Sequence, residues 1–389
     1  MKRASTCLQH HSLPAKKAYS SCGEKLEFRR FVDFHGTTDK SFRTNWGTDL
    51  ENVSVLGEGV FGTVFEVADA EKKKKFALKL FKAGHTQFGC EDWVRESELS
   101  IPNYLQIMKS VAAAHHPNLI KLVKSGKMAS VPEGYLRIAI LMELRGKSLF
   151  SVMDSTKSEV PNKEISFPIA TIREIGAQIL SAMKKLEKME IVHLDLKPEN
   201  ICFTSTCTFT TEIRKDVCYI SPSEELNVCI IDFGNARKSN QEDLKSSEVV
   251  QTQNYRAPEI FMGLPFSTRS DVWSFGCILS ELYTGELLFY GNDEHDTEQL
   301  QFELMQLILQ QAPSYLMMRK AAENKKKMIC IDGNVYMKKR AKSSFDPPLP
   351  LYKQRRRNDR AAIPLFELLE RILIFDPTRR LTFSEISSE

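Results

Sequence analysis

The residues at positions 193–200 read His-Leu-Asp-Leu-Lys-Pro-Glu-Asn, and this stretch decides the fold and chemistry predicted for the chain. Asp195 is spaced to accept or orient the proton of a substrate hydroxyl, and Lys197 to neutralise charge on a transferred phosphoryl group. Asn200 offers a neutral oxygen ligand to a metal ion. His193 is better interpreted as a structural hydrogen-bonding residue than as a base. The stretch therefore predicts a loop for metal-assisted phosphoryl transfer.

Two motifs downstream suit the same chemistry. An Asp-Phe-Gly sequence begins at Asp232 and adds a carboxylate to Asn200. Because hard oxygen ligands suit Mg²⁺, these two side chains are the predicted metal ligands. A Tyr-Arg-Ala-Pro-Glu sequence ends at Glu259, and Arg380, within Asp-Pro-Thr-Arg-Arg, is the predicted ion-pair partner of this glutamate.

A glycine-rich stretch, Gly-Glu-Gly-Val-Phe-Gly-Thr-Val, lies upstream at residues 57–64. Its G-x-G-x-x-G pattern also occurs in dinucleotide-binding units, but there a helix begins at the third glycine. Here the glycines lead into Val-Phe-Glu-Val, which is a predicted strand. Gly57, Gly59 and Gly62 are therefore expected in a hairpin flap whose backbone amides cover phosphates.

Lys79 ends a Phe-Ala-Leu-Lys sequence shortly after these glycines. A lysine among apolar neighbours is usually a surface residue that extends its amine to water. At this distance from a glycine flap it is better interpreted as the lysine that orients phosphates, and it then needs a carboxylate from the following helix. Glu98 fits best, because Leu99, Ile101 and Leu105 then lie on the buried side. Glu96 is the alternative. Pro102 is expected to kink this helix or to mark its boundary, which leaves the alignment open.

The order of expected elements indicates an α+β fold with two lobes. Residues 1–45 are polar and are expected to form a disordered or loosely attached arm. Short β-like runs follow at residues 53–56, 64–67, 76–80, 119–123 and 136–144, with a helix over 91–108. Helical spacing then dominates at residues 169–189, 272–283, 300–309 and 363–374. We expect a domain over 46–389, with a small β-rich N-lobe (about 46–146) and a larger helical C-lobe (about 147–389).

Composition excludes several other classes of protein. The 389 residues carry a formal net charge of +4 without one concentrated basic face, which argues against direct nucleic-acid binding. The longest apolar stretch, residues 136–144, is too short to span a membrane. Nine cysteines without C-x-x-C pairs suit free thiols in a reducing compartment. Two polar segments, at about 204–227 and 321–359, are expected to interrupt the C-lobe. The basic triplets of the second are interpreted as solvated loop charge, with docking or nuclear targeting as the alternatives.

Together the motifs resemble the eukaryotic protein kinase superfamily over about residues 50–387. The resemblance implies the bilobal protein kinase fold, ATP and Mg²⁺ as cofactors, a protein substrate and a monomer located in the nucleus, the cytoplasm or both. Serine and threonine are the expected acceptors, and tyrosine is left open. An inactive scaffold on the same fold is the alternative, but such a protein is expected to lack Lys79, Asp195, Asn200 or Asp232, and all four are present.

Within the superfamily the chain is similar to the CMGC group, in particular its Clk (LAMMER), DYRK and homeodomain-interacting branches. The residues that carry this likeness are Asn-Tyr-Arg-Ala-Pro-Glu-Ile at 254–260, Gly-Leu-Pro-Phe-Ser at 263–267 and Asp-Val-Trp-Ser-Phe-Gly-Cys-Ile-Leu at 271–279. The chain departs from the Clk pattern at residues 298–305, which read Glu-Gln-Leu-Gln-Phe-Glu-Leu-Met. Leu194 stands where many kinases carry an arginine that binds a phosphate on the activation segment.

The resemblance also implies an adenine site. Met142 is the expected gatekeeper, and backbone groups of Glu143 and Arg145 are expected to hydrogen-bond the base edge. The remaining residues expected around the base are Leu56, Val64, Ala77, Cys202 and Ile231.

Overall fold

The structure is a computed structural model, and the described residues lie within the unit Lys40–Glu389. They are residues 41–45, 49–59, 62–83, 91–204, 206–239, 250–290, 297–323, 328–331, 334–337, 349–356 and 358–387. Side chains are described in these ranges except at residues 41, 91–100, 297, 328–331 and 334–337. Most of the predicted arm over residues 1–45 lies outside the described part of the chain.

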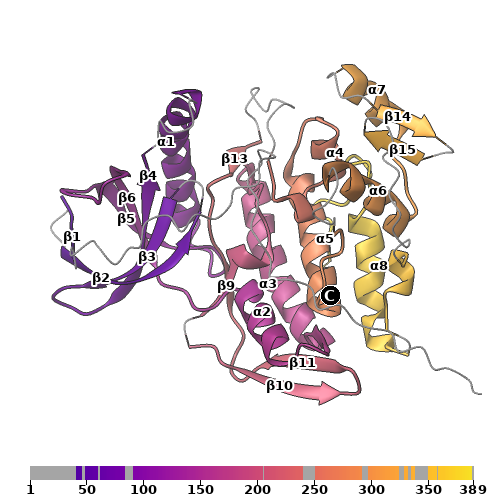
Figure 1. The fold of residues 1–389 in the computed structure, drawn as a ribbon, viewed down its shortest axis with the longest axis horizontal. Coiled ribbons are helices and arrows are strands. Elements are labelled where there is room, and N and C mark those ends of the chain that lie inside the picture. Colours follow the sequence, from indigo (N-terminus) through magenta and orange to yellow (C-terminus); the bar gives the residue numbers. More distant parts are fainter. Residues whose placement is uncertain are drawn as a thin grey trace, which may run out of the picture. The chain divides into compact units, whose positions relative to one another are not determined.

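The N-lobe contains a six-stranded antiparallel sheet and helix α1 (Glu91–Ala113) (Figure 1). The strands follow the order β1-β2-β3-β4-β6-β5 across the sheet. Their bounds are β1 Ser41–Arg43, β2 Asp49–Glu58, β3 Gly62–Asp69, β4 Lys75–Lys82, β5 Leu122–Lys127 and β6 Tyr135–Glu143.

The alternation of side chains along β4 determines which way Lys79 points. Leu78 and Leu80 are buried in a small cluster on one face of the sheet. Ala77 and Phe81 belong to the main core on the other face, with residues of α1. Because side chains alternate along a strand, Lys79 lies on the same face as Ala77 and Phe81. The strand therefore directs this lysine toward α1.

The C-lobe is mainly helical, with several short sheets. Its helices are α2 Leu149–Glu159, α3 Ile169–Lys188, α4 Pro258–Phe261, α5 Thr268–Thr284, α6 Thr297–Leu309, α7 Tyr315–Glu323 and α8 Ile363–Ile372. Its strands are β7 Glu164–Ser166, β8 Ile191–Val192, β9 Ile201–Phe203, β10 Phe209–Arg214, β11 Val217–Pro222, β12 Val228–Ile230, β13 Arg237–Lys238, β14 Met328–Ile331 and β15 Asn334–Met337. Single 3₁₀ turns occur at Pro198–Asn200, Gln253–Tyr255, Leu351–Lys353 and Arg360–Ala362.

Helix α5 is the central support of the C-lobe. It begins at a capping box formed by Ser267 and Ser270, and it ends at Gly285, which has a φ of +73°. Every residue from Ser270 to Tyr283 is buried. The helix contacts α3, α8, β7 and β8. A Cβ atom on Gly276 would lie 2.8 Å from Leu373, so glycine is what lets the segment after α8 approach so closely.

The predicted α+β fold with two lobes is confirmed, and three local expectations need correction. The predicted strands at residues 53–56, 64–67 and 76–80 lie within β2, β3 and β4, and the one at 136–144 matches β6 except for Leu144. The run at 119–123 becomes a strand only from Leu122. Helix α1 continues through Pro102 to Ala113. The segment at residues 204–227, expected to be a polar interruption, contains the β10–β11 hairpin, and β11 pairs with β7 in parallel.

Candidate active site

The loop before β9 is anchored by Asp271 of α5. The carboxylate of Asp271 is buried and accepts hydrogen bonds from the backbone N–H of His193 (2.7 Å) and of Leu194 (2.9 Å). Burial raises the pKa of Asp271 to about 7, although the two hydrogen bonds act in the opposite direction. Leu194 has a φ of +61°, a strained conformation for a residue other than glycine. The two bonds to Asp271 hold that conformation in place.

His193 has a structural role in this loop. Its Nε2 donates to the carbonyl of Ile231 (3.2 Å), and its Nδ1 accepts from the backbone N–H of Asp195 (3.2 Å). Burial lowers the pKa of His193, which favours the neutral ring that this pattern requires. The ring also packs edge-on against Phe233. These contacts agree with the structural interpretation made from the sequence.

The carboxylate of Asp195 is held by three neighbouring side chains. Its Oδ2 lies 3.1 Å from Lys197 Nζ and accepts from Asn200 Nδ2 at 3.1 Å. Its Oδ1 accepts from the hydroxyl of Thr252 at 2.6 Å, and the same hydroxyl accepts from Lys197 at 2.9 Å. Thr252 was missed in the sequence, where its only signal is its place three residues before the Tyr-Arg-Ala-Pro-Glu motif. The arrangement fixes one carboxylate as an oriented hydrogen-bond acceptor.

The predicted metal ligands, Asn200 and Asp232, both present oxygen atoms. Asn200 Nδ2 also donates to the carbonyl of Asp195 (2.8 Å), which leaves the amide oxygen as the end available to a cation. Asp232 has a φ of +55°, and its side chain is 42% exposed. The described residues hold no group of three His, Cys, Asp or Glu side chains suited to a metal. Two oxygen ligands therefore fit an ion such as Mg²⁺ that takes its other ligands from water and phosphate.

Lys79 pairs with Asp232 in this structure. The Nζ atom lies 2.7 Å from Asp232 Oδ1, and only 7% of the lysine side chain is exposed. Burial disfavours the charged ammonium, but the charge of Asp232 outweighs this cost and raises the pKa of Lys79. Burial alone would also raise the pKa of Asp232, yet the charge of Lys79 holds it below its ordinary value. Strands β4 and β12 thus bring the predicted phosphate-binding lysine and one predicted metal ligand together.

The expected partner of Lys79 on α1 is not settled by these contacts. The side chains of Glu98 and Glu96 lie outside the described residues, so the predicted Lys79–Glu98 pair stays a prediction. The described α1 residue beside the lysine is Tyr104, whose ring centroid lies 5.2 Å from Nζ.

The three glycines of the flap differ in what requires them. A Cβ atom on Gly62 would lie 2.2 Å from the carbonyl oxygen of Leu80, so the pairing of β3 with β4 needs glycine there. A Cβ on Gly57 would have no described atom within 4 Å, and one on Gly59 would be 3.8 Å from the nearest. Packing within the described chain therefore does not explain Gly57 and Gly59. Close approach of a ligand to their backbone, the role expected from the sequence, stays a prediction for these two glycines.

The residues expected around adenine come from both lobes. Ala77 and Met142 are buried and directly paired between β4 and β6. Cys202 is buried on β9, where it pairs with Cys229 of β12. Val64 and Ile231 are half-buried, whereas Leu56 on β2 is exposed. The side chains of Glu143 and Arg145 form an ion pair (3.2 Å). Their contacts with a base stay predictions.

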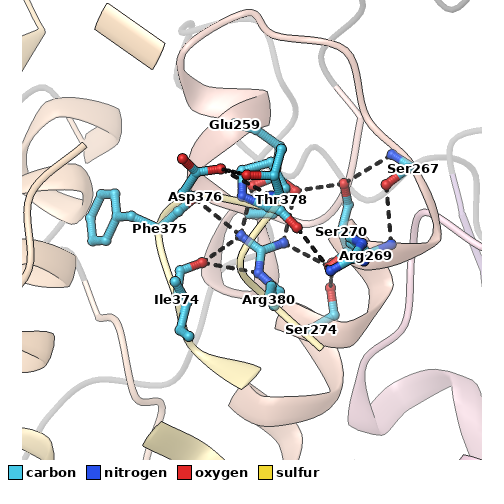
Figure 2. Close-up of polar contacts among 12 residues, drawn as sticks. Glu259, Ser267, Arg269, Ser270, Ser274, Ile374, Phe375, Asp376, Thr378 and Arg380 are labelled. Carbon is cyan, nitrogen blue, oxygen red and sulfur yellow. Dashed lines mark hydrogen bonds and ion pairs between the residues drawn. The ribbon is translucent and has the colours of Figure 1, made fainter. Parts of the chain in front are cut away.

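The predicted ion pair between Glu259 and Arg380 is confirmed. Both side chains are fully buried, and the guanidinium donates to the two carboxylate oxygens at 2.8 and 2.9 Å (Figure 2). Ser270 Oγ donates to the same carboxylate at 2.8 Å. The pair joins the segment after α8 to α4, and Ser270 connects it to the N-terminal end of α5.

Arg256 is also engaged within the protein. It donates to the carbonyls of Val250 (3.0 Å) and Gln251 (3.1 Å), and it forms an ion pair with Glu298 (2.9 Å). Its guanidinium is therefore already committed to the segment that precedes α4.

Comparison with known proteins agrees with this geometry. The family model described as "Protein kinase domain" matches residues 50–389. The serine/threonine-protein kinase AFC2 of Arabidopsis thaliana is 30% identical over 346 residues, which are 85% of this chain and 74% of that protein. The dual specificity protein kinase CLK2 of Mus musculus is 30% identical over 346 residues, and the match covers 86% of this chain and 62% of the mouse protein.

Similarity in structure extends to a solved kinase domain. Its crystal structure has a TM-score of 0.67 to this chain at 24% identity, and the match covers 86% of this chain and 93% of the other. At that identity the likeness supports the fold alone. Among the described helices, none has the length and apolar character needed to cross a bilayer.

Proposed function

The chain belongs to the protein kinase family, and we propose that it uses ATP with Mg²⁺ to phosphorylate serine and threonine side chains of proteins, with tyrosine as a further acceptor. The similarity to AFC2 and CLK2 supports a place in the Clk-like branch of the CMGC group. The observation that carries the proposal is the carboxylate of Asp195, held by Lys197, Asn200 and Thr252.

Each polar residue of the site has a part in this reaction. Asp195 accepts or orients the proton of the substrate hydroxyl, while Lys197 and Thr252 keep the carboxylate in one orientation. Asn200 and Asp232 would hold Mg²⁺, which supplies positive charge for the phosphate oxygens. Lys79 binds the phosphates of ATP, and the backbone of the glycine flap covers them.

The test is phosphorylation of a generic basic protein by the purified chain with labelled ATP. Asp195→Asn and Asp232→Asn should each lower kcat by at least about 10²-fold, because both remove charge that acts in the transition state. Asp154→Asn, which changes an exposed aspartate of α2, is the matched control and should leave the rate unchanged. A rate that survives both substitutions at the site would show that the protein is a scaffold, not an enzyme.

A further inference from the structure

Tyr104 occupies the place on α1 that faces Lys79. Its side chain is 5% exposed and packs edge-on against Phe81, with 5.6 Å between ring centroids. Phe81 lies on the same face of β4 as Lys79, so the strand presents both residues to this tyrosine. The ammonium of Lys79 lies 5.2 Å from the ring centroid, within the range of a cation–π contact.

The hydroxyl of Tyr104 is buried and makes no hydrogen bond of normal geometry among the described residues, although the charge of Lys79 acts on it. Burial raises the pKa of Tyr104 to about 12, so the group is a neutral phenol. A buried hydroxyl without a partner destabilises a protein, and tyrosine hydroxyls in cores usually find one. Packing alone therefore does not explain why this position, which faces Lys79 and Asp232, carries a tyrosine rather than a phenylalanine.

Helix geometry separates Tyr104 from the glutamates of α1. Residues three and four positions away share a helix face, and for Tyr104 these are Ser100, Ile101, Ile107 and Met108, none of which is acidic. Glu98 precedes Tyr104 by six residues, which corresponds to roughly 9 Å along the axis. The positions nearest to Tyr104 on its helix face therefore carry no carboxylate.

We propose that Tyr104, in place of a helix carboxylate, is the residue that positions Lys79 for ATP. In protein kinases this lysine ordinarily pairs with a glutamate of the helix. Here the ring face of Tyr104 holds the ammonium, and its hydroxyl is an acceptor for one of the three N–H donors. This inference rests on the proposed role of Lys79 in binding phosphates.

A neutral partner has a specific consequence for the site. The ion pair with Asp232 uses a carboxylate that the proposed reaction needs for Mg²⁺. Once that carboxylate binds a cation, the hydroxyl of Tyr104 is the remaining protein acceptor described near Lys79. Unlike a glutamate, it does not neutralise the ammonium, so the full charge of Lys79 stays available to phosphate oxygens.

Tyr104→Phe tests the hydroxyl alone, because it keeps the ring. We expect kcat/KM for ATP to fall about tenfold, as for the loss of one hydrogen bond to a charged group. The Kd for ATP measured by calorimetry should rise by a similar factor. The unfolding midpoint of the ligand-free protein should stay the same or rise, because the hydroxyl makes no hydrogen bond of normal geometry there. Tyr104→Leu also removes the ring and should lower kcat/KM further.

Three further variants make the result decisive. Tyr219→Phe, which changes a half-buried tyrosine of β11, is the matched control and should leave both constants unchanged. If Glu98→Gln lowered kcat/KM at least tenfold while Tyr104→Phe stayed within twofold of wild type, the helix partner would be Glu98 and the inference would be wrong. Lys79→Met separates this failure from that of the proposed function: a protein that retained full activity without Lys79 would contradict the assignment of the site itself.

Discussion

Replacing Arg380 by methionine is expected to destabilise the protein more than any surface substitution. The guanidinium is fully buried and donates to both oxygens of Glu259. It also donates to the carbonyls of Arg269 (2.7 Å) and Ile374 (2.8 Å). Methionine fills similar space but provides no donor, so a charged carboxylate and three carbonyls, including that of Phe375 (3.3 Å), would lose this donor at once.

The loss of the charge determines the size of the effect. Removing one partner of a buried ion pair typically costs about 3–5 kcal/mol, because the other charge is left uncompensated. Ser270 Oγ still donates to Glu259, but a hydroxyl does not neutralise a carboxylate. We therefore expect the free energy of unfolding to fall by about 4 kcal/mol. For an m-value of about 3 kcal/mol/M, the urea midpoint should decrease by roughly 1 M.

The assay is urea unfolding with the m-value fitted for each variant. Arg379→Met changes the exposed neighbouring arginine and should shift the midpoint very little. Combining Arg380→Met with Glu259→Gln removes the uncompensated charge, so the double variant should be more stable than Arg380→Met alone. A loss below about 1 kcal/mol for Arg380→Met at unchanged m, or a double variant no more stable than the single one, would refute the reasoning.

Three further predictions concern the flap, the activation segment and pH. Gly62→Ala should lower the unfolding midpoint, because its Cβ would meet a backbone oxygen at 2.2 Å. Gly57→Ala should keep the unfolding midpoint and raise KM for ATP, and equal shifts of the midpoint in the two variants would contradict this. Because Leu194 is buried and has no donor for a phosphate, enzyme with the serines at 239, 246 and 247 changed to alanine should keep its activity within about threefold, a difference below roughly 1 kcal/mol. Residues 246 and 247 lie outside the described ranges, and a tenfold loss that rephosphorylation restores would show that another basic residue reads the segment. The pKa of Asp271 is raised from 3.8 to about 7, so the folded protein binds the proton more tightly than the unfolded chain does. Between these two pKa values, 3.8 and about 7, the free energy of unfolding therefore falls as pH rises. The stability of wild type relative to Asp271→Asn should be greater at pH 5 than at pH 8, and parallel pH profiles would contradict the shift.

The sequence predicts contacts best where both partners lie in recognisable motifs. Glu259 and Arg380 are 121 positions apart, yet each ends or belongs to a motif, and their pairing was predicted and confirmed. Thr252 lies in the same region and contacts Asp195 over 57 positions, but a lone threonine has no spacing or charge that identifies its partner. Such a contact exists only once the fold has brought the two segments together.

Tertiary packing explains two of the three local corrections, the path of α1 through Pro102 and the β10–β11 hairpin. A proline inside a helix removes a hydrogen bond, so Pro102 indicated a kink or an end. The apolar residues on either side of it, Ile101, Ile107 and Met108, are buried in the main core, and that burial sustains the helix through the proline. The β10–β11 hairpin is similar, because β11 gains its stability by pairing with β7, about 50 residues earlier. Local sequence preferences identify neither the core that buries α1 nor the strand that pairs with β11.

The strained backbone at Leu194 is held by buried polar contacts of α5, and α5 in turn contacts residues far from the site. Leu194 keeps its positive φ through Asp271, and the neighbouring Ser270 donates to Glu259, which Arg380 holds. The same helix, α5, thus carries both the anchor of the catalytic loop and the contact to the segment after α8. Because Ser270 and Asp271 are adjacent in α5, a backbone shift at one moves the other, so the effects of Asp271→Asn and Arg380→Met on stability should not add. A distant buried ion pair would then contribute to holding Asp195 in its orientation, although it touches neither ATP nor the protein substrate.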